Sequence, residues 1–281
     1  MENIFIRFYY YFKKMRKFSF LNKTSFKKIH KSYSLKLKLL FNQYHHYGIH
    51  FHIIVFFLAL NKFLKTNLIL ESGVGPGHST KYINFYCYKN NIKSYSVDFN
   101  AYYLDQRVID VKKFNKNSKF IKGDGYYELL KLVSKYNNKN ISLLLDGPKG
   151  MRGLSLIYSC MLINRNIKFA MIDDVIENST VFNSLKINKF SFNIYDLLKD
   201  NTEFIKNKKM TLKMFNNDKN NISKITKKNL FQKREWIIFK LDKNFYYPGI
   251  LKPKLMKLLV SFKIWFIIRF LIKLDNILFK N

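Results

Sequence analysis

The sequence predicts an α/β fold in which a doubly wound, mostly parallel sheet carries helices on both faces. Three observations support this prediction. Apolar runs typical of buried strands alternate with helix-like segments from residue 67 onward. An acidic residue stands at the end of one such run after another. The first run leads into a short loop that holds three of the chain's ten glycines, Gly73, Gly75 and Gly77.

Composition divides the 281 residues into a central domain and two basic extensions. We place the domain at residues 48–245, a basic aromatic N-terminal extension at 1–47 and a basic apolar C-terminal helix at 246–281. Residues 1–47 hold eleven Lys and Arg and residues 251–281 hold seven, against one acid each. We expect these helical ends either to touch an anionic surface with their aromatic rings at the interface or to pack as ordinary extensions.

The formal net charge is +33, from 51 Lys and Arg against 18 Asp and Glu. So positive a chain attracts nucleic acid, anionic lipid or acidic glycans, although an AT-rich genome also raises the lysine count. Cys87 and Cys160 form no C-x-x-C pair, which favours a reducing compartment. We find neither a secretory signal nor an apolar run of about 18 residues. We therefore expect a cytoplasmic protein, with peripheral attachment to the inner face of a membrane as the variant.

An apolar stretch over residues 49–64 predicts a helix that packs on the sheet ahead of its first strand. His46 and His50 are four residues apart, which places them on one face of a helix, and such a pair can bind zinc. No H-E-x-x-H arrangement is present, and no nearby Cys or Asp completes a site, so packed imidazoles are the favoured interpretation. The histidines of this region are His45, His46, His50 and His52.

Strands and helices then alternate. Five parallel strands are predicted over residues 67–71, 93–98, 119–122, 141–146 and 168–173. The helices that follow the first four strands are predicted over residues 78–88, 101–114, 126–136 and 154–163. This alternation is typical of a parallel sheet whose crossover helices cover both faces.

The remaining elements are less regular. Residues 191–195 and 210–215 are the two candidates for a sixth strand, and residues 235–241 predict the last one. Prolines then precede an apolar helix over residues 255–279, whose basic side chains project to different sides. This helix has three candidate partners: a membrane surface, the domain itself or a second subunit.

Acidic residues recur at the carboxyl ends of the predicted strands, which is the edge where open parallel sheets bind ligands. In a chain with 18 acids this placement argues against an ordinary solvated surface. The residues are Glu71, Asp98, Asp124, Asp146, Asp173 and Asp174.

The glycine loop distinguishes between cofactors. A dinucleotide fold uses G-x-G-x-x-G, which seats a pyrophosphate on a helix N-terminus. Here the loop reads E-x-G-x-G-x-G over residues 71–77. This spacing resembles motif I of the class I S-adenosylmethionine-dependent methyltransferases. The resemblance covers residues 50–242 and implies a Rossmann-like fold that binds S-adenosylmethionine.

The resemblance also implies which residues bind that cofactor. Asp98 takes the place of the acid that holds the ribose hydroxyls. Asp124 is part of a Gly-Asp pair and takes the place of the acid that contacts the adenine amino group. The alternative is a Rossmann-like domain that binds another nucleotide or none. The full set of cofactor-binding residues is Glu71, Ser72, Gly73, Gly75, Gly77, Asp98 and Asp124.

Two further segments, residues 143–149 and 171–175, resemble the metal segments of the catechol and caffeoyl-CoA O-methyltransferases. By that resemblance Lys149 accepts or steers the proton of a substrate hydroxyl, and Asp146 is its catalytic partner. The implied ligands of Mg²⁺ are Asp146, Asp173 and Asp174. Asp174 stands where the family has Asn. The alternative is that Asp146 lines the methyl site while the Asp173–Asp174 pair caps a helix.

These features predict an S-adenosylmethionine-dependent methyltransferase that acts on oxygen of a small molecule or glycan. Two alternatives stay open. One is a non-catalytic basic protein of the same fold that binds an anionic surface. The other is an RNA methyltransferase, which the charge favours, although no Asn-Pro-Pro-Tyr-like segment follows the fourth strand. The expected partners are thus the acceptor and an anionic membrane surface, with nucleic acid less favoured.

Overall fold

A seven-stranded sheet forms the centre of the protein, and its strand order is β3-β2-β1-β4-β5-β7-β6. The computed structural model describes residues 21, 23–40, 49–75, 77–99, 116–217, 235–242, 245, 247–249 and 251–278. The parallel strands are β1 (Leu68–Ser72), β2 (Lys93–Asp98), β3 (Ser118–Lys122), β4 (Ile141–Leu145) and β5 (Ile167–Ile172). The predicted parallel strands are therefore confirmed.

The far edge of the sheet is antiparallel. β7 (Trp236–Ile238) pairs with both β5 and β6 (Ser191–Asn193) in antiparallel register. The last predicted strand is confirmed in a shorter form. Of the two candidates for the sixth strand, residues 191–195 contain β6, which ends at Asn193; Ile194 and Tyr195 begin the short helix α9 (Ile194–Leu197). Residues 210–215 were wrong, because they lie within helix α10 (Thr202–Asn217), which packs on helices of the N-terminal half.

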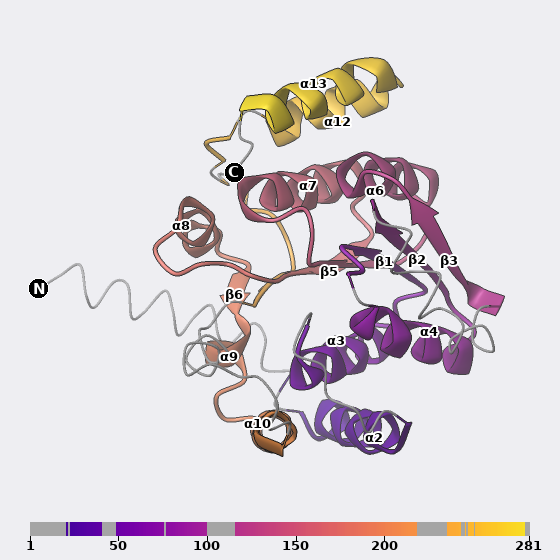
Figure 1. The fold of residues 1–281 in the computed structure, drawn as a ribbon, viewed down its shortest axis with the longest axis vertical. Helices are drawn as coiled ribbons and strands as arrows, with labels where there is room; N and C mark the ends of the chain where they lie inside the picture. The colour runs from indigo at the N-terminus through magenta and orange to yellow at the C-terminus, as the bar shows by residue number, and fades with distance from the viewer. Residues whose placement is uncertain are drawn as a thin grey trace, which may run out of the picture.

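Helices cover both faces of the sheet (Figure 1). On one face lie α6 (Gly125–Lys135) and α7 (Gly150–Ile163), and on the other lie α3 (Phe51–Phe63) and α4 (His78–Asn90). α2 (Thr24–Leu40) and α10 pack outside α3. Two short helices, α8 (Thr180–Ile187) and α9 (Ile194–Leu197), flank β6. The result is a doubly wound, Rossmann-like α/β fold.

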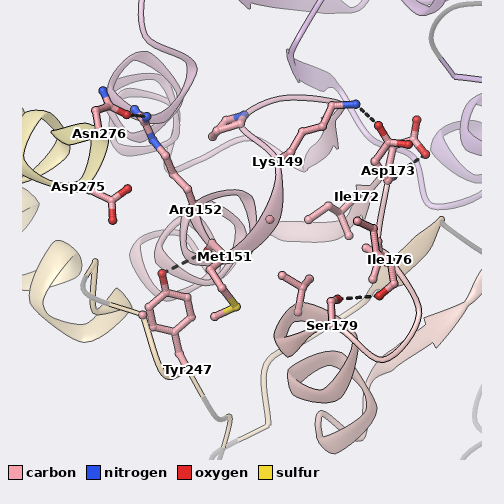
Figure 2. A pocket seen from close by; sticks show the side chains of 16 residues that line it. Lys149, Met151, Arg152, Ile172, Asp173, Ile176, Ser179, Tyr247, Asp275 and Asn276 are labelled. Atoms are coloured by element: carbon pink, nitrogen blue, oxygen red, sulfur yellow. Dashed lines mark hydrogen bonds and ion pairs between the residues drawn. The ribbon is translucent and has the colours of Figure 1, made fainter. Parts of the chain in front are cut away.

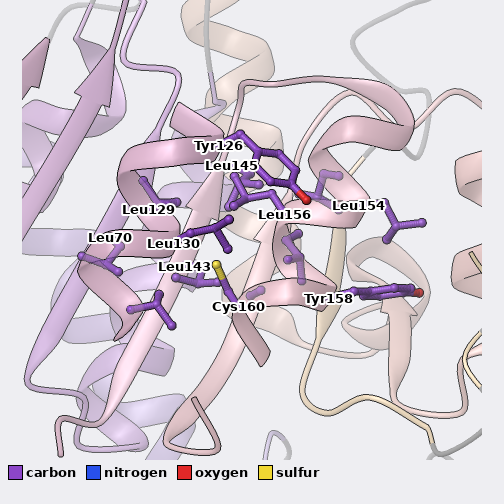
Figure 3. Close-up of a cluster of buried hydrophobic side chains, with 14 of the residues drawn as sticks. Leu70, Tyr126, Leu129, Leu130, Leu143, Leu145, Leu154, Leu156, Tyr158 and Cys160 are labelled. Atoms are coloured by element: carbon purple, nitrogen blue, oxygen red, sulfur yellow. The ribbon is translucent and has the colours of Figure 1, made fainter. Parts of the chain in front are cut away.

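Two hydrophobic cores lie on the two faces of the sheet, because successive side chains of a strand point to opposite faces. Leu70 and Leu143 belong to the core under α6 and α7, which Figure 3 shows. Their neighbours Ile69 and Leu144 belong to the core that α3 and α4 cover. These strands are buried on both sides, which explains why they read as continuous apolar runs.

The C-terminal region differs from the prediction of one helix over residues 255–279. It forms two helices, α12 (Pro253–Ser261) and α13 (Trp265–Leu278). Lys263 has a left-handed φ of 56°, and the N–H groups of Lys263 and Ile264 bond to the carbonyls of Val260 and Leu259. This is a Schellman C-cap with lysine where glycine is usual. No glycine therefore marks the break between α12 and α13 in the sequence.

Several expectations concern residues beyond those described. The predicted helix over residues 101–114, His45, His46 and most of the N-terminal extension lie outside the described residues. His52 is buried, and its ring nitrogens lie 3.2 Å from Thr211 Oγ1 and 3.1 Å from the Tyr195 hydroxyl. Packing therefore accounts for this histidine. In the part of the chain that the structure describes, no helix has the length and apolarity needed to cross a membrane.

Candidate functional site

The glycine loop after β1 is held on one side and open on the other. Gly73, Gly75 and Gly77 have φ values of 83°, 49° and 81°, which glycine adopts without steric strain. A Cβ on Gly73 would overlap backbone atoms of Gly147, whereas a Cβ on Gly75 or Gly77 would meet no described residue beyond its chain neighbours within 4 Å. Gly73 thus packs this loop against the loop after β4. The other two glycines leave backbone accessible to a ligand.

Asp98, at the end of β2, fixes the shape of this loop. Its Oδ2 accepts hydrogen bonds from the backbone N–H groups of Val74, at 2.8 Å, and Gly75, at 2.9 Å. A carboxylate that accepts two backbone N–H bonds is a strong anchor for a loop. The sequence predicted a contact between Asp98 and a ribose, and the structure adds this second task.

Glu71 is buried beneath the loop, with 1% of its surface exposed. Its carboxylate accepts hydrogen bonds from Ser79 Oγ at 2.5 Å, Thr80 Oγ1 at 2.7 Å and Ser96 Oγ at 2.7 Å. Burial raises the Glu71 pKa, and the three hydroxyls oppose that rise. Glu71 therefore joins β1 to β2 and to the first turn of α4, which positions the loop from within the protein.

The neighbouring Ser72 brings three loops together. Its carbonyl oxygen accepts hydrogen bonds from the N–H groups of Asp146, at 2.9 Å, and Gly147, at 3.1 Å. A Cβ on Gly125, after β3, would overlap Ser72 Oγ. The loops after β1, β3 and β4 therefore approach one another closely, and only small residues fit between them.

Asp124 is engaged through both carboxylate oxygens. Its Oδ1 caps α6 by accepting from the N–H of Tyr127 at 3.1 Å, and its Oδ2 pairs with Arg152 Nη2 at 2.5 Å. Arg152 also donates to Asn276 Oδ1 in α13. The predicted adenine contact of Asp124 stays a prediction, while the structure gives this residue a role in fixing α6 and α7.

A lysine lies between two carboxylates at the ends of β4 and β5. Lys149 Nζ is 3.1 Å from Asp146 Oδ1 and also bonds Asp174 Oδ2. Burial raises the Asp146 pKa and Lys149 opposes that rise. Burial lowers the Lys149 pKa, but the two carboxylates outweigh it and leave the pKa above its ordinary value. Lys149 is therefore a cation at neutral pH and cannot accept a proton there.

The residues at this edge do not fit Mg²⁺. Among the described residues, no group of three or more His, Cys, Asp or Glu side chains could hold a metal ion. The ammonium of Lys149 takes the position between Asp146 and Asp174 that a cation would need. Asp173 is half-buried, and its Oδ1 accepts a hydrogen bond from the N–H of Asp174 at 2.7 Å. Asp146, Asp173 and Asp174 therefore do not form a Mg²⁺ site in this arrangement.

The alternative for the Asp173–Asp174 pair also fails. Asp174 has a left-handed φ of 57°, so the chain turns at this point. The next helix, α8, is capped by Ser179, whose Oγ accepts from the N–H of Phe182 at 3.2 Å. Asp173 and Asp174 therefore cap no helix, and they lie instead at the wall of a cavity.

That cavity has a volume of about 920 Å³ and lies beside Lys149 (Figure 2). The start of α7 and the end of β5 form one part of its wall. Tyr247, whose hydroxyl donates to the carbonyl of Met151 at 3.2 Å, forms another. The C-terminal helix α13 closes it with Asp275 and Asn276. Apolar and charged groups are thus mixed around one space that Lys149 and Asp174 also line.

Sequence reasoning missed the contributions of Arg152, Tyr247, Asp275 and Asn276. The sequence places the C-terminal helix in an extension, and its apolar pattern does not predict that it reaches the strand ends. Asp275 is the one acid of residues 251–281, and that isolation was the available signal. Burial raises its pKa, and Arg152 opposes the rise.

No protein-family model matches the chain, and no curated protein matches it either. Among solved structures, it is similar to a Podospora anserina methyltransferase bound to S-adenosylhomocysteine, with 12% identity over 68% of this chain and 78% of that chain and a TM-score of 0.40. It is also similar to an S-adenosylmethionine-dependent methyltransferase from Geobacter sulfurreducens, with 13% identity over 69% and 92% and a TM-score of 0.38.

These values are too low to carry an argument about function, so the assignment depends on the geometry of the chain itself. That geometry has three parts: a glycine loop with accessible backbone, a carboxylate–lysine–carboxylate group and a cavity lined by Lys149, Asp174 and the C-terminal helix. All three lie at the carboxyl edge of the parallel strands, which is where a sheet of this kind binds its ligands. The chain is thus a Rossmann-like α/β protein with a built site at that edge.

Proposed function

We propose that this chain is an S-adenosylmethionine-dependent methyltransferase that methylates oxygen of a small molecule or glycan. The observation that carries the proposal is the pairing of two features. The glycine loop, anchored by Asp98, exposes backbone at Gly75 and Gly77. The Asp146–Lys149 pair and a cavity of about 920 Å³ lie at the neighbouring strand ends.

The loop suits a zwitterionic amino acid attached to a sulfonium better than a pyrophosphate. The N–H groups at the start of α4 would favour a carboxylate, as at other helix N-termini. Asp98 and Asp146 supply negative charge near the place where the sulfonium would lie. Asp98 would also accept from the ribose diol, as the motif resemblance implies.

The residues support a direct transfer in one step. Bound S-adenosylmethionine would supply an electrophilic methyl group; the acceptor oxygen would take up that group while the bond from sulfur to carbon breaks, and the electron pair would stay on sulfur to give S-adenosylhomocysteine. The hydroxyl proton goes to the Asp146 carboxylate, whose raised pKa makes it a better base than an exposed aspartate. Lys149 holds that carboxylate and steers the acceptor by its charge. Most of the acceleration then comes from orientation of the two reactants.

The cavity favours an acceptor of small-molecule size. Ligand pockets typically measure about 300–1,000 Å³ and combine apolar walls with a few convergent polar groups. Here Ile172 and Val181 supply apolar wall, and Asp275 and Asn276 supply polar groups. A hydroxylated compound or a sugar fits this combination.

An RNA methyltransferase is the second candidate, because the net charge of +33 favours a polyanion. The salt dependence of RNA binding separates the two. Phosphate contacts would make the affinity fall steeply with salt. If the affinity for RNA changes little with salt concentration, a small-molecule or glycan acceptor is the better proposal. Turnover measurements then test the alternative of a non-catalytic protein.

The test begins with calorimetry of S-adenosylmethionine and S-adenosylhomocysteine binding to the full chain. A screen with radiolabelled methyl groups over phenols, sugars and RNA then finds the acceptor. Asp146→Asn should bind both ligands but lose methyl transfer by about 10²-fold or more. Asp200→Asn, at an exposed position on the surface, is the matched control and should retain activity. Absence of any binding of S-adenosylmethionine would overturn the proposal.

A further inference from the structure

The C-terminal helices α12 and α13 carry an apolar surface that faces away from the protein. Of the thirteen large hydrophobic residues that are exposed in the described chain, seven lie on these helices or on the turn between them. We call this set the outer apolar face. It consists of Leu255, Leu258, Phe262, Phe266, Phe270, Ile277 and Leu278.

Helical spacing aligns these side chains. Leu255, Leu258 and Phe262 follow one another at three and four residues, which places them on one side of α12 and its end. Phe266 and Phe270 are four residues apart on α13 and are 73% and 63% exposed. The outer apolar face is therefore a stripe along each helix and not a scatter of single residues.

The outer apolar face is not needed for packing of the helices on the domain. Each helix has a second, inner stripe, represented by Met256 on α12 and Ile268 on α13, which are both fully buried. These residues belong to the core that also contains α6 and α7. Figure 1 shows α12 and α13 as an outer layer beyond those helices. The ring of Trp265 lies inward, edge-on to the ring of Tyr127 with 5.8 Å between their centroids, and is therefore not part of the outer apolar face.

Basic side chains flank the outer apolar face, while the one acid of this region does not. Lys254, Lys257, Lys263 and Lys273 are exposed. Asp275 lines the cavity on the inner side of α13. Arg269 stacks over the ring of Tyr127, with its guanidinium carbon 4.5 Å from the centroid. The outward side of the helix pair thus combines large apolar groups with positive charge alone.

We propose that the outer apolar face of α12 and α13 binds the surface of an anionic lipid bilayer. Aromatic and aliphatic groups enter the boundary between headgroups and acyl chains, and lysines reach anionic headgroups with their long stems along the apolar surface. A bound protein would cover the rings without accounting for the lysines. A nucleic acid would use the lysines but leave Leu255, Leu258 and Ile277 in water.

The geometry requires the helices to lie along the bilayer. α13 has fourteen residues, so its length of about 21 Å is shorter than the hydrocarbon core of about 30 Å. Asp275 and Asn276 face the cavity from the inner side of the same helix. A bilayer bound to the outer apolar face would therefore lie across α13 from the cavity.

Sedimentation of the full chain with vesicles tests the proposal. Vesicles of phosphatidylcholine alone are compared with vesicles that also contain phosphatidylglycerol. The chain should sediment with the anionic vesicles only. Phe262→Ser, Phe266→Ser and Phe270→Ser combined should weaken the partition constant by about tenfold or more. Lys254→Glu, Lys257→Glu and Lys263→Glu combined should weaken it by roughly a hundredfold, since each basic contact near an anionic surface counts.

Matched substitutions elsewhere keep the test specific. The first control set, Leu35→Ser with Ile187→Ser, removes exposed apolar groups from other helices. The second set, Lys93→Glu with Lys119→Glu and Lys139→Glu, reverses exposed charges near the amino ends of the strands β2, β3 and β4. Both sets should bind vesicles as the unsubstituted chain does. Equal recovery with neutral and anionic vesicles overturns the proposal, as does full binding by the triple Phe variant. Self-association lost in that variant, without vesicle binding, would assign the face to a second copy instead.

Discussion

The carboxylate of Asp98 accepts a hydrogen bond from the backbone N–H of Gly75 at 2.9 Å, and so joins the end of β2 to the glycine loop. Asp98→Ala removes this anchor together with the proposed acceptor of the ribose diol. Hydrogen bonds to charged groups contribute about 1.5–3 kcal/mol, so the affinity for S-adenosylhomocysteine should fall roughly ten- to a hundredfold. Calorimetry measures this loss. Asp98→Asn keeps an acceptor oxygen and should lose less of this affinity. A loss of affinity below about twofold in Asp98→Ala would mean that other residues anchor the loop and bind the ribose.

The open space at Gly75 gives the second prediction. Gly75→Val places a Cβ that has no described residue beyond its chain neighbours within 4 Å, at a φ of 49°. The strain costs about 1–3 kcal/mol, which a domain of this size tolerates, while ligand binding should be abolished. Gly150→Val is the control, because Gly150 has a φ of 64° and open space but lies outside the loop. It should show a similar drop in melting temperature and bind S-adenosylhomocysteine normally. Unchanged affinity in Gly75→Val would remove the loop from the site.

The charge of Lys149 predicts a shift in the pH dependence of methyl transfer. Lys149 opposes the rise in the Asp146 pKa that burial causes. Lys149→Met removes that opposition, so the Asp146 pKa should rise further and the acid limb of the kcat profile should move to higher pH. Lys149→Arg keeps the charge and should leave the limb in place. The profile is measured with the acceptor that the screen identifies. A limb that does not move in Lys149→Met would exclude Asp146 as the titrating base.

Asp173 predicts a stability that falls as pH rises. Burial raises its pKa well above 3.8, and Glu235, Asp146 and Asp174 add to the rise. The folded chain therefore keeps this proton at pH values where the unfolded chain has lost it, so stability falls between the unfolded and the folded pKa. Asp173→Asn keeps the oxygen that accepts from the Asp174 N–H but has no charge to bury. It should melt at a higher temperature than the unsubstituted chain at pH 7, and the gain should shrink toward pH 4.

Thermal unfolding by circular dichroism across that pH range measures the effect. Asp200→Asn, at an exposed site, should change the melting temperature little at any pH. A constant difference between Asp173→Asn and the unsubstituted chain would show that the gain has a source other than the ionisation of Asp173.

Arg152 links the start of α6 to the C-terminal helix α13, since it pairs with Asp124 at 2.5 Å and also donates to Asn276. Arg152→Ala leaves both partners without it and should lower the free energy of unfolding by about 1–3 kcal/mol. Hydrogen exchange should accelerate most in α13. Arg165→Ala removes an exposed arginine and is the matched control. Unchanged exchange of α13 in Arg152→Ala would mean that apolar packing alone holds this helix.

The sequence by itself determined the parallel part of the fold. Strands such as residues 68–70 and 143–145 are continuously apolar because helices cover both sides of the sheet, and that pattern is local and readable. The glycine loop was also readable, because three glycines stand close together in the sequence; Gly73, Gly75 and Gly77 all adopt positive φ values, which glycine takes without strain. Once these strands were located, the sequence also showed that acidic residues stand at their carboxyl ends.

Only the tertiary structure decided how those acids are used. Glu71 turned out to hold three hydroxyls and Asp98 to hold two loop amides, because partners distant in sequence meet there. The metal expectation failed at Asp146 and Asp174 because the flexible stem of Lys149 carries its ammonium between them. A sequence lists these charges but does not say which of them meet.

The C-terminal region shows the same limit. Its helix pair was read as one helix, because Lys263 adopts a left-handed conformation that its residue type does not announce. That turn lets α12 and α13 lie side by side over α7 and α6. It also brings Asp275 and Asn276 to the cavity, more than a hundred residues along the chain from Lys149. Periodicity predicts which residues are apolar, whereas contacts across such distances are set by packing of the whole chain.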